Sequence, residues 1–324
     1  MEQAVRVALR PAQAQDWLAD EHLLALIRFQ TEGERPSDDP REVTVPLAQL
    51  GAEPLVETWT TATPVIERGE HEGLRYAATE HTLFGHLRLD DAGEGDAEAV
   101  AEAAYTKILA FIAQRPQRHL LRMWNYLPAI NQGEGDAERY RQFCVGRYRA
   151  FEQAQGEPSQ FPAATAIGSH INGQYISFLA GVTPGKPVEN PRQVSAFKYP
   201  RQYGPRSPSF SRATLKRWAC GGYSLLVSGT ASVVGHETHH QDLVAQLQET
   251  ARNLAALQAE AGLPLRPDVL RVYVRDRADL PAVQQAVAGI PELQVPMVFL
   301  EGDICRQNLI LEVEAVYEAA DVSA

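Results

Sequence analysis

The strongest constraint on the fold of this 324-residue chain is an order of predicted secondary structure that occurs twice. Short apolar runs predict strands, and apolar residues spaced three or four positions apart predict helices. Each half follows the order strand, helix, strand, helix, strand, strand. The first set covers residues 84–89, 97–113, 120–127, 137–151, 164–168 and 175–179, and the second covers 222–227, 243–261, 269–274, 280–287, 295–300 and 309–316. The repeated order predicts a tandem duplication of the α+β class, with mixed β-sheets whose helices pack on one face.

The boundary between the two units is predicted at a segment rich in proline and glycine. Residues 181–192 read GVTPGKPVENPR and hold four prolines or glycines in their first seven positions. Such residues favour turns and linkers over helices and strands. We therefore expect one domain at residues 1–190, including an N-terminal extension, and a second at residues 191–324. A polar, proline-containing segment at residues 33–41 is expected to be a loop.

The composition argues against several classes of protein. The formal net charge is −11, whereas nucleic-acid binding needs a basic surface. No apolar run approaches the roughly 18 residues of a membrane-spanning helix, and the N-terminus lacks the apolar core of a secretory signal. The three cysteines have no CxxC spacing, so neither a disulfide framework nor a zinc ribbon is predicted. We expect a cytoplasmic protein without nucleic-acid or membrane partners, and the oligomeric state, monomer or small homo-oligomer, is left open.

Two local clusters of arginine stand out in this acidic chain. They are Arg139, Arg141, Arg147 and Arg149 in the first half, and Arg201, Arg206, Arg212 and Arg217 in the second. A guanidinium group matches a carboxylate with two parallel hydrogen bonds, so such clusters suggest a site for a small anion. Arg147 follows Tyr140 by seven residues on a predicted helix, which places both side chains on one helix face. The alternative is that these arginines are solvated or paired with surface acids.

The last predicted strand, residues 309–316, carries two glutamates on one face. Side chains alternate along a strand, so Glu312 and Glu314 share a face, while the opposite face is apolar. If the two units press these faces together, Glu312 lies in a partly dry cleft, where burial and the nearby Glu314 raise its pKa. Such a carboxyl group can donate a proton near neutral pH. The alternative is a solvent-facing strand on which the glutamates have no chemical role.

Residues 236–240 match the HExxH pattern of zinc hydrolases, with His236, Glu237 and His240 as the candidate residues. That pattern needs both histidines on one helix, one turn apart. Here the next helix is predicted to begin near residue 238 or 241, which leaves His236 outside it and disfavours a zinc site. Cys144 is a conceivable nucleophile, but a cysteine within a helix is more often a small buried apolar residue.

The second half of the chain resembles a RidA/YjgF-type domain. The matching segments are LVSG (226–229), AEAG (259–262), VYVRD (272–276) and LEVEAV (311–316). In that family the first glutamate of the closing strand is a functional acid, and this glutamate aligns with Glu312. The family's substrate-binding arginine would fall near Met297 and is absent, which counts against imine hydrolysis.

The chain as a whole resembles the chorismatase family, whose members contain two RidA-like halves and act on chorismate. The resemblance rests on WNYLPAIN (124–131), RYRQFCVGR (139–147), FKYPRQYGPRSPSFSR (197–212), SGTASVVGH (228–236) and GDICRQNLILEVE (302–314). It implies that Glu312 is the general acid and that Cys305 lines the pocket and steers the product. The substrate contacts that it implies are Tyr140, Arg147, Tyr199 and Arg212. Tyr203 and Arg206 are further candidates from the same proline-rich loop, residues 199–212.

The resemblance implies an enzyme that removes pyruvate from chorismate without a metal or an organic cofactor. Glu312 would protonate the methylene carbon of the enolpyruvyl group while the arginines bind the dianion. The similarity is greatest to chorismatases of aryl-polyene pigment pathways, so 3- and/or 4-hydroxybenzoate is the expected product, whereas capture of water would give a dihydroxycyclohexadiene acid. The alternatives are a RidA-type imine deaminase or small-molecule-binding protein, and a zinc hydrolase using the HExxH residues.

Overall fold

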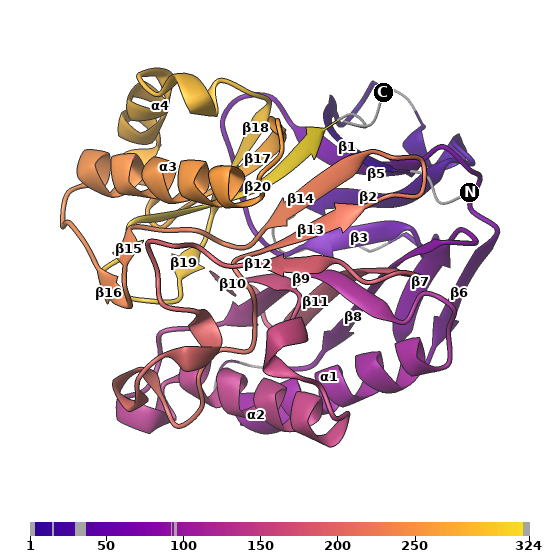
Figure 1. Ribbon diagram of the computed structural model, residues 1–324, viewed down its shortest axis with the longest axis horizontal. Coiled ribbons are helices and arrows are strands. Elements are labelled where there is room, and N and C mark those ends of the chain that lie inside the picture. The colour runs from indigo at the N-terminus through magenta and orange to yellow at the C-terminus, as the bar shows by residue number, and fades with distance from the viewer. Residues whose placement is uncertain (1–3, 15, 30–36, 92, 94–95, 320–324) are drawn as a thin grey trace.

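The structure, a computed structural model, describes residues 4–14, 16–29, 37–91, 93 and 96–319. Two seven-stranded sheets lie face to face between two pairs of helices, and a four-stranded sheet lies beside them (Figure 1). Helices α1 and α2 cover one outer face of this stack, and α3 and α4 cover the opposite one. In the described part of the chain, no helix is both long and apolar enough to cross a membrane.

Two consecutive units of the chain have the same topology. The first comprises β7 (Leu74–Ala78), β8 (Thr82–Leu89), α1 (Ala97–Ala113), β9 (His119–Pro128), α2 (Arg139–Gln153), β10 (Ala163–Ser169) and β11 (Gln174–Gly181). The second comprises β13 (Ala213–Arg217), β14 (Tyr223–Val227), α3 (Leu243–Glu260), β17 (Arg266–Val274), α4 (Leu280–Ala288), β18 (Met297–Glu301) and β20 (Leu311–Ala319). Their strand orders, β10-β9-β11-β8-β7 and β18-β17-β20-β14-β13, correspond strand for strand, and in each only the first pair is parallel. The predicted tandem duplication of the α+β class is therefore confirmed.

Each sheet also takes a short strand from the other half of the chain. In the first sheet, β19 (Asp303–Ile304) pairs with β10, and β6 (Glu67–His71) forms the other edge. In the second sheet, β4 (Gln49–Leu50) pairs with β18, and β12 (Lys186–Val188) forms the other edge. The two halves are thus interlocked by backbone hydrogen bonds. The division at residues 190 and 191 stays a prediction, with β12 lying just before it.

Local sequence explains where the two long helices begin. Asp96 accepts a hydrogen bond from the Ala99 amide at the start of α1, and Asp242 accepts one from the Ala245 amide at the start of α3. Such side-chain caps satisfy amides that have no partner inside the helix. The second helix ends before Gly262, whose φ of +70° suits glycine.

The core explains the alternation predicted for the last strand. Leu311, Val313 and Ala315 pack against α3 and its neighbours in one apolar cluster. The opposite face of β20 points toward the first unit, where Trp59, Trp124 and other large side chains fill the space between the sheets. Glu312 and Glu314 lie on this inner face and are each 5% exposed. The solvent-facing alternative for this strand is therefore wrong.

The N-terminal region forms a sheet that the sequence patterns did not predict. Its order is β1-β5-β2-β3, built from β1 (Val5–Pro11), β5 (Leu55–Thr61), β2 (Leu23–Phe29) and β3 (Glu42–Val45). The predicted loop at residues 33–41 lies partly outside the described residues, and its last part forms turns before β3. Residues 199–212 form an irregular segment apart from one short 3₁₀ turn, Arg201–Tyr203, as predicted.

Candidate active site

One pocket of about 490 Å³ lies where the two units meet. The six residues to which the family resemblance assigns a role all line this pocket: Tyr140 and Arg147 from α2, Tyr199 and Arg212 from the segment before β13, Cys305 from the turn after β19, and Glu312 from β20. Residues up to 172 positions apart are thus brought together by the stacking of the two sheets. The roles assigned to these residues stay predictions, because shared placement does not by itself establish a role.

Glu312 supplies a buried carboxyl group to the pocket. Within the described residues, its carboxyl group forms neither a hydrogen bond nor an ion pair. Burial is the main cause that raises the pKa of Glu312, and the adjacent charge of Glu314 adds to it. These effects outweigh the three surrounding arginines and bring the pKa of Glu312 to about 8. The group therefore carries a proton at neutral pH.

Arg147 brings a guanidinium group into the pocket, and no carboxylate of the described residues forms an ion pair with it. The residue is 3% exposed, and its guanidinium carbon lies 5.0 Å from the centre of the Tyr105 ring. Among the described residues, its Nε and Nη2 have no hydrogen-bond partner. Leaving a buried donor unpaired costs about 1–3 kcal/mol, and more for a charged group. Donors of this kind are suited to hydrogen bonding with an anion.

Arg212 is held more firmly but also has a free donor. Its Nη2 donates to the Tyr199 hydroxyl at 2.7 Å and to the Val194 carbonyl at 2.8 Å. Its Nε is buried and has no partner within the described residues. The guanidinium group also lies over the Tyr199 and Phe210 rings. Tyr199 therefore orients Arg212, and both side chains reach the pocket.

Tyr140 and Cys305 line the pocket as neutral groups. Burial raises the pKa of Tyr140 well above its usual value, and the nearby thiols and Glu312 raise it further. Burial, followed by the charge of Glu312, raises the pKa of the Cys305 thiol to about 12. Both side chains keep their protons at neutral pH. They can shape the pocket and donate weak or ordinary hydrogen bonds, but neither is activated as a nucleophile.

Most other arginines of the two clusters have structural partners. Arg139 pairs with Asp91 at 2.6 Å, and Arg201 pairs with Asp136 at 2.6 Å. Arg206 lies over the Tyr148 ring, 4.3 Å from its centre, and does not line the pocket. Arg141 lines the pocket but is paired with Glu138. The paired-arginine alternative thus holds for several of these residues, but not for Arg147 or Arg212.

Arg306, Gly229 and Thr165 are among the pocket residues that were not identified from the sequence. Arg306 lines the pocket and stacks on Tyr203, with its guanidinium carbon 4.4 Å from the ring centre. Gly229 packs directly against Glu312, because a Cβ at this position would overlap Glu312 Oε1. Thr165 on β10 also lines the pocket. None of the three belongs to a periodic sequence pattern. They line the site because the two units come together there.

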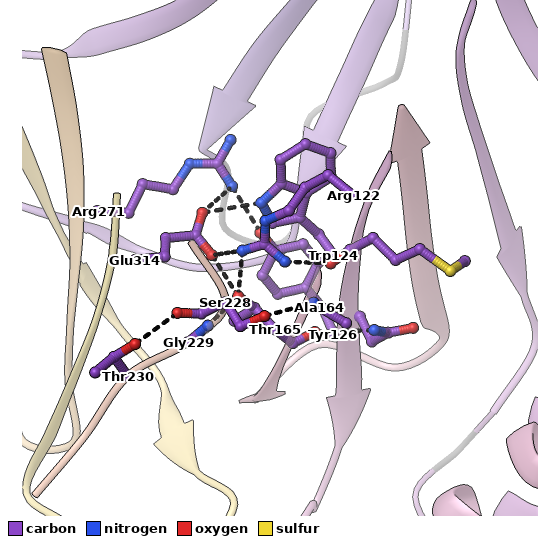
Figure 2. Close-up of polar contacts among 12 residues, drawn as sticks. Arg122, Trp124, Tyr126, Ala164, Thr165, Ser228, Gly229, Thr230, Arg271 and Glu314 are labelled. Carbon is purple, nitrogen blue, oxygen red and sulfur yellow. Dashed lines mark hydrogen bonds and ion pairs between the residues drawn. The ribbon is translucent and has the colours of Figure 1, made fainter. Parts of the chain in front are cut away.

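Behind the pocket, Glu314 lies in a buried network that joins the two units (Figure 2). Its carboxylate accepts hydrogen bonds from Arg122 at 2.7 Å, from Trp124 at 2.9 Å and from Thr165 at 2.6 Å. Arg271 lies 3.2 Å away and is itself paired with Glu57. Each of these hydrogen-bond partners donates to the Glu314 carboxylate, and Arg271 adds a positive charge beside it. Glu312 and Glu314 therefore have opposite environments, although only one residue separates them.

The HExxH residues do not share a helix. Glu237 lies in the two-residue strand β16 (Glu237–Thr238), which pairs with β15 (Val233–Val234), and α3 begins only at Leu243. His236 lies 3.2 Å from the Tyr203 hydroxyl, whereas His240 faces Glu249. Within the described residues, no group of three or more His, Cys, Asp or Glu side chains is arranged to hold a metal ion. The motif thus lacks the helical geometry of zinc hydrolases.

Comparison with known proteins identifies the family that shares this sequence and fold. The family model described as chorismatase FkbO/Hyg5-like, N-terminal, matches residues 57–180. A 3-hydroxybenzoate synthase of Streptomyces hygroscopicus is 37% identical over 313 residues, which cover 91% of this chain and 91% of that protein. A chorismatase of Streptomyces rapamycinicus is 36% identical and covers 94% of this chain and 95% of that protein. The chain belongs to the chorismatase family.

The similarity to the chorismatase family extends to the three-dimensional structure. A crystal structure of a chorismatase matches with a TM-score of 0.85 and 30% identity, over 98% of this chain and 99% of that chain. This coverage leaves too few residues for the N-terminal sheet to lie outside the match. The four-stranded sheet is therefore part of the chorismatase fold, together with the two tandem units.

Proposed function

We propose that this protein is a chorismatase that removes pyruvate from chorismate. The observation that carries the proposal is the pairing, in one pocket, of a protonated Glu312 with the unpaired guanidinium donors of Arg147 and Arg212. Chorismate is a dianion with two carboxylates and an acid-labile enolpyruvyl ether. The pocket thus offers a cation for each carboxylate and a proton for the ether.

The chemistry follows from the placement of these groups. Arg147 and Arg212 bind the carboxylates, with Tyr199 orienting Arg212. Glu312 gives its proton to the methylene carbon of the enolpyruvyl group, which creates an oxocarbenium-like centre. The bond between the ring and the ether oxygen then breaks, and pyruvate leaves with that oxygen. The ring loses a proton as it becomes aromatic, which balances the proton that Glu312 donated.

Positioning and electrostatics account for this mechanism. Holding a reactant against a catalytic group removes much of the entropic cost of their encounter. Fixed charges in a water-poor pocket stabilise developing charge more strongly than water does. Loss of the proton from the ring carbon that carries the hydroxyl group gives 4-hydroxybenzoate. The 3-isomer, which the similarity to a 3-hydroxybenzoate synthase favours as the main product, also requires the hydroxyl oxygen to move to the neighbouring ring carbon from which pyruvate left.

Incubation with chorismate tests the proposal. We expect pyruvate and hydroxybenzoate in equal amounts, measured separately by a lactate dehydrogenase-coupled assay and by chromatography with authentic standards. Pyruvate with a dihydroxycyclohexadiene acid would correct the product but keep the reaction class. Unchanged chorismate would contradict the proposal.

Activity should not depend on a metal ion. The HExxH residues lack a common helix, and the proposed chemistry uses only side chains of the pocket. Prolonged treatment with EDTA should therefore leave kcat and KM for chorismate unchanged. A stoichiometric zinc content, together with activity that falls on chelation and returns with zinc, would contradict this prediction and favour the zinc-hydrolase alternative.

The pH profile should report the proton on Glu312. Because the acid form is the active form and its pKa is about 8, kcat/KM should be level near neutral pH and fall as the pH rises past about 8. An ordinary glutamate would instead lose its proton, and the enzyme its activity, near pH 4–5. A profile that falls throughout the range between pH 5 and pH 7 would show that Glu312 is not the proton donor.

Two expectations from the sequence complete the proposal. The reducing environment suggested by the three cysteines, all free in the structure, fits a cytoplasmic location. We also expect a monomer or a small homo-oligomer, two states that light scattering distinguishes.

A further inference from the structure

The hydroxyl group of Thr165 lies at the junction between the two units. Thr165 belongs to β10 and is 2% exposed. Its hydroxyl donates to Glu314 at 2.6 Å and accepts from Arg122 at 2.5 Å and from the Gly229 amide at 2.9 Å. A hydroxyl group has one hydrogen to donate and two lone pairs that can accept. The Thr165 hydroxyl uses its hydrogen and both lone pairs in these three hydrogen bonds (Figure 2).

One of these bonds fixes the backbone against which Glu312 packs. Gly229 lies in the connection between β14 and β15, and no room for a Cβ remains between its Cα and the Glu312 carboxyl group. The Thr165 side chain lies on the same side of this backbone, because its Cγ2 would lie 3.2 Å from such a Cβ. The position of Gly229 therefore sets how deeply the Glu312 carboxyl group is enclosed. Thr165 holds that position through the amide of Gly229.

The neighbouring contacts extend this support across the interface. The Ala164 amide donates to the Ser228 hydroxyl at 2.8 Å, and the Ser228 hydroxyl donates to the Ser211 carbonyl at 2.6 Å. Thr230 then pairs with Val313 of β20 through backbone hydrogen bonds at 2.8 and 2.9 Å. The segment carrying Gly229 is thus tied to the first unit on one side and to the strand of Glu312 on the other.

We propose that Thr165 is a positioning residue for Glu312, which it acts on through the Gly229 backbone and the Glu314 carboxylate. The inference rests on the proposed function for its catalytic consequence, but the effect on Glu312 itself does not require turnover. Thr165 fixes the wall that keeps water from the acid, and it holds the Glu314 charge close by. Both effects favour the protonated form of Glu312.

Removal of the hydroxyl group should loosen this arrangement. Thr165→Val keeps the branched shape but leaves the Gly229 amide without its acceptor, so the segment can shift and admit water to Glu312. Better hydration lowers the pKa of a buried carboxyl group. The charged and titratable groups facing Glu312 remain in place: Glu314 on β20, Arg122 on β9, Tyr140 on α2, Arg212 before β13, and Cys305 and Arg306 after β19.

The test compares Thr165→Val with Thr165→Ser and with Thr250→Val as a matched control. Thr250 is buried in α3, and among the described residues its hydroxyl bonds only to the Gln246 carbonyl of the same helix. We expect Thr165→Val to lower kcat roughly 10- to 100-fold with little change in KM, as for a misplaced catalytic group. The high-pH fall of kcat/KM should move down by roughly one pH unit. Thr165→Ser and Thr250→Val should keep the wild-type profile, and a merely structural role would change stability without moving the profile.

An infrared titration separates this inference from the proposed function. The protonated carboxyl band of Glu312, assigned with Glu312→Gln, reports its ionisation without any substrate. A lower titration midpoint in Thr165→Val would support the inference even if chorismate is not turned over. An unchanged midpoint would overturn it even if the enzyme is an active chorismatase. Thr165→Ala serves as the hydroxyl-free variant if Thr165→Val does not fold.

Discussion

Glu312→Gln is expected to lower kcat for chorismate by roughly two to four orders of magnitude, the usual contribution of a general acid. Glutamine keeps the size of the side chain and can still form hydrogen bonds, but it cannot donate an acidic proton. Binding should persist, because the arginines that face the substrate are untouched. Calorimetric titration with chorismate, alongside the pyruvate assay, separates the lost chemistry from retained binding.

The same variant should fold at least as stably as the wild type. Burial raises the pKa of Glu312 to about 8, so the folded protein holds a proton that the unfolded chain releases at pH values above about 4.5. The wild type therefore loses stability as the pH rises between these values, and a neutral glutamine avoids this loss. Thermal unfolding should show the difference in Tm growing in favour of Glu312→Gln up to pH 8.

Glu318→Gln, on the same strand but outside the pocket, is the matched control for activity and should leave kcat unchanged. Near-normal turnover by Glu312→Gln would remove the proposed proton donor.

Replacement of either pocket arginine by alanine is expected to weaken transition-state binding by about 2–5 kcal/mol, the usual cost of leaving a buried charge unpaired. This loss corresponds to a fall in kcat/KM of roughly 30-fold to several thousand-fold. In Arg147→Ala the affinity for chorismate should also fall, because Arg147 Nε and Nη2 have no competing protein acceptor among the described residues. In Arg212→Ala, Tyr199 also loses its partner.

Arg206→Ala is the matched control for these two variants. Arg206 belongs to the same arginine-rich segment as Arg212, but its guanidinium group lies over Tyr148 and outside the pocket. Its kcat/KM for chorismate should stay within about twofold of the wild type, as is usual for surface substitutions. Equal losses in all three variants would indicate a general electrostatic effect. Normal kcat/KM in both Arg147→Ala and Arg212→Ala would contradict the assignment of the carboxylate sites.

The helices and long strands could be predicted because their signals are local. The helix predicted at residues 97–113 matches α1, and the long helix of the second half ends just before Gly262. The strands β4 and β19, of two residues each, have no such signal, since each is defined by its partner in the other half. The N-terminal sheet was also missed, because its strands do not repeat the order found in the two units.

The site could be predicted only in part, for a related reason. Alternation along β20 placed Glu312 and Glu314 on one face, and the family resemblance supplied the residues that accompany Glu312. The different environments of the two glutamates could not be predicted, because Arg122 and Thr165 reach Glu314 across 192 and 149 positions of sequence. Only the stacking of the sheets decides that Glu314 is paired while Glu312 faces the pocket.

The most direct test of the central claim is a crystal structure of Glu312→Gln soaked with chorismate. The variant should bind the substrate without consuming it. We predict one chorismate in the pocket, with its carboxylates on Arg147 and Arg212 and its enolpyruvyl methylene carbon about 3–3.5 Å from the side chain of residue 312, the separation at which groups react. A bound chorismate whose methylene carbon points away from residue 312, or whose carboxylates contact neither arginine, would contradict the account.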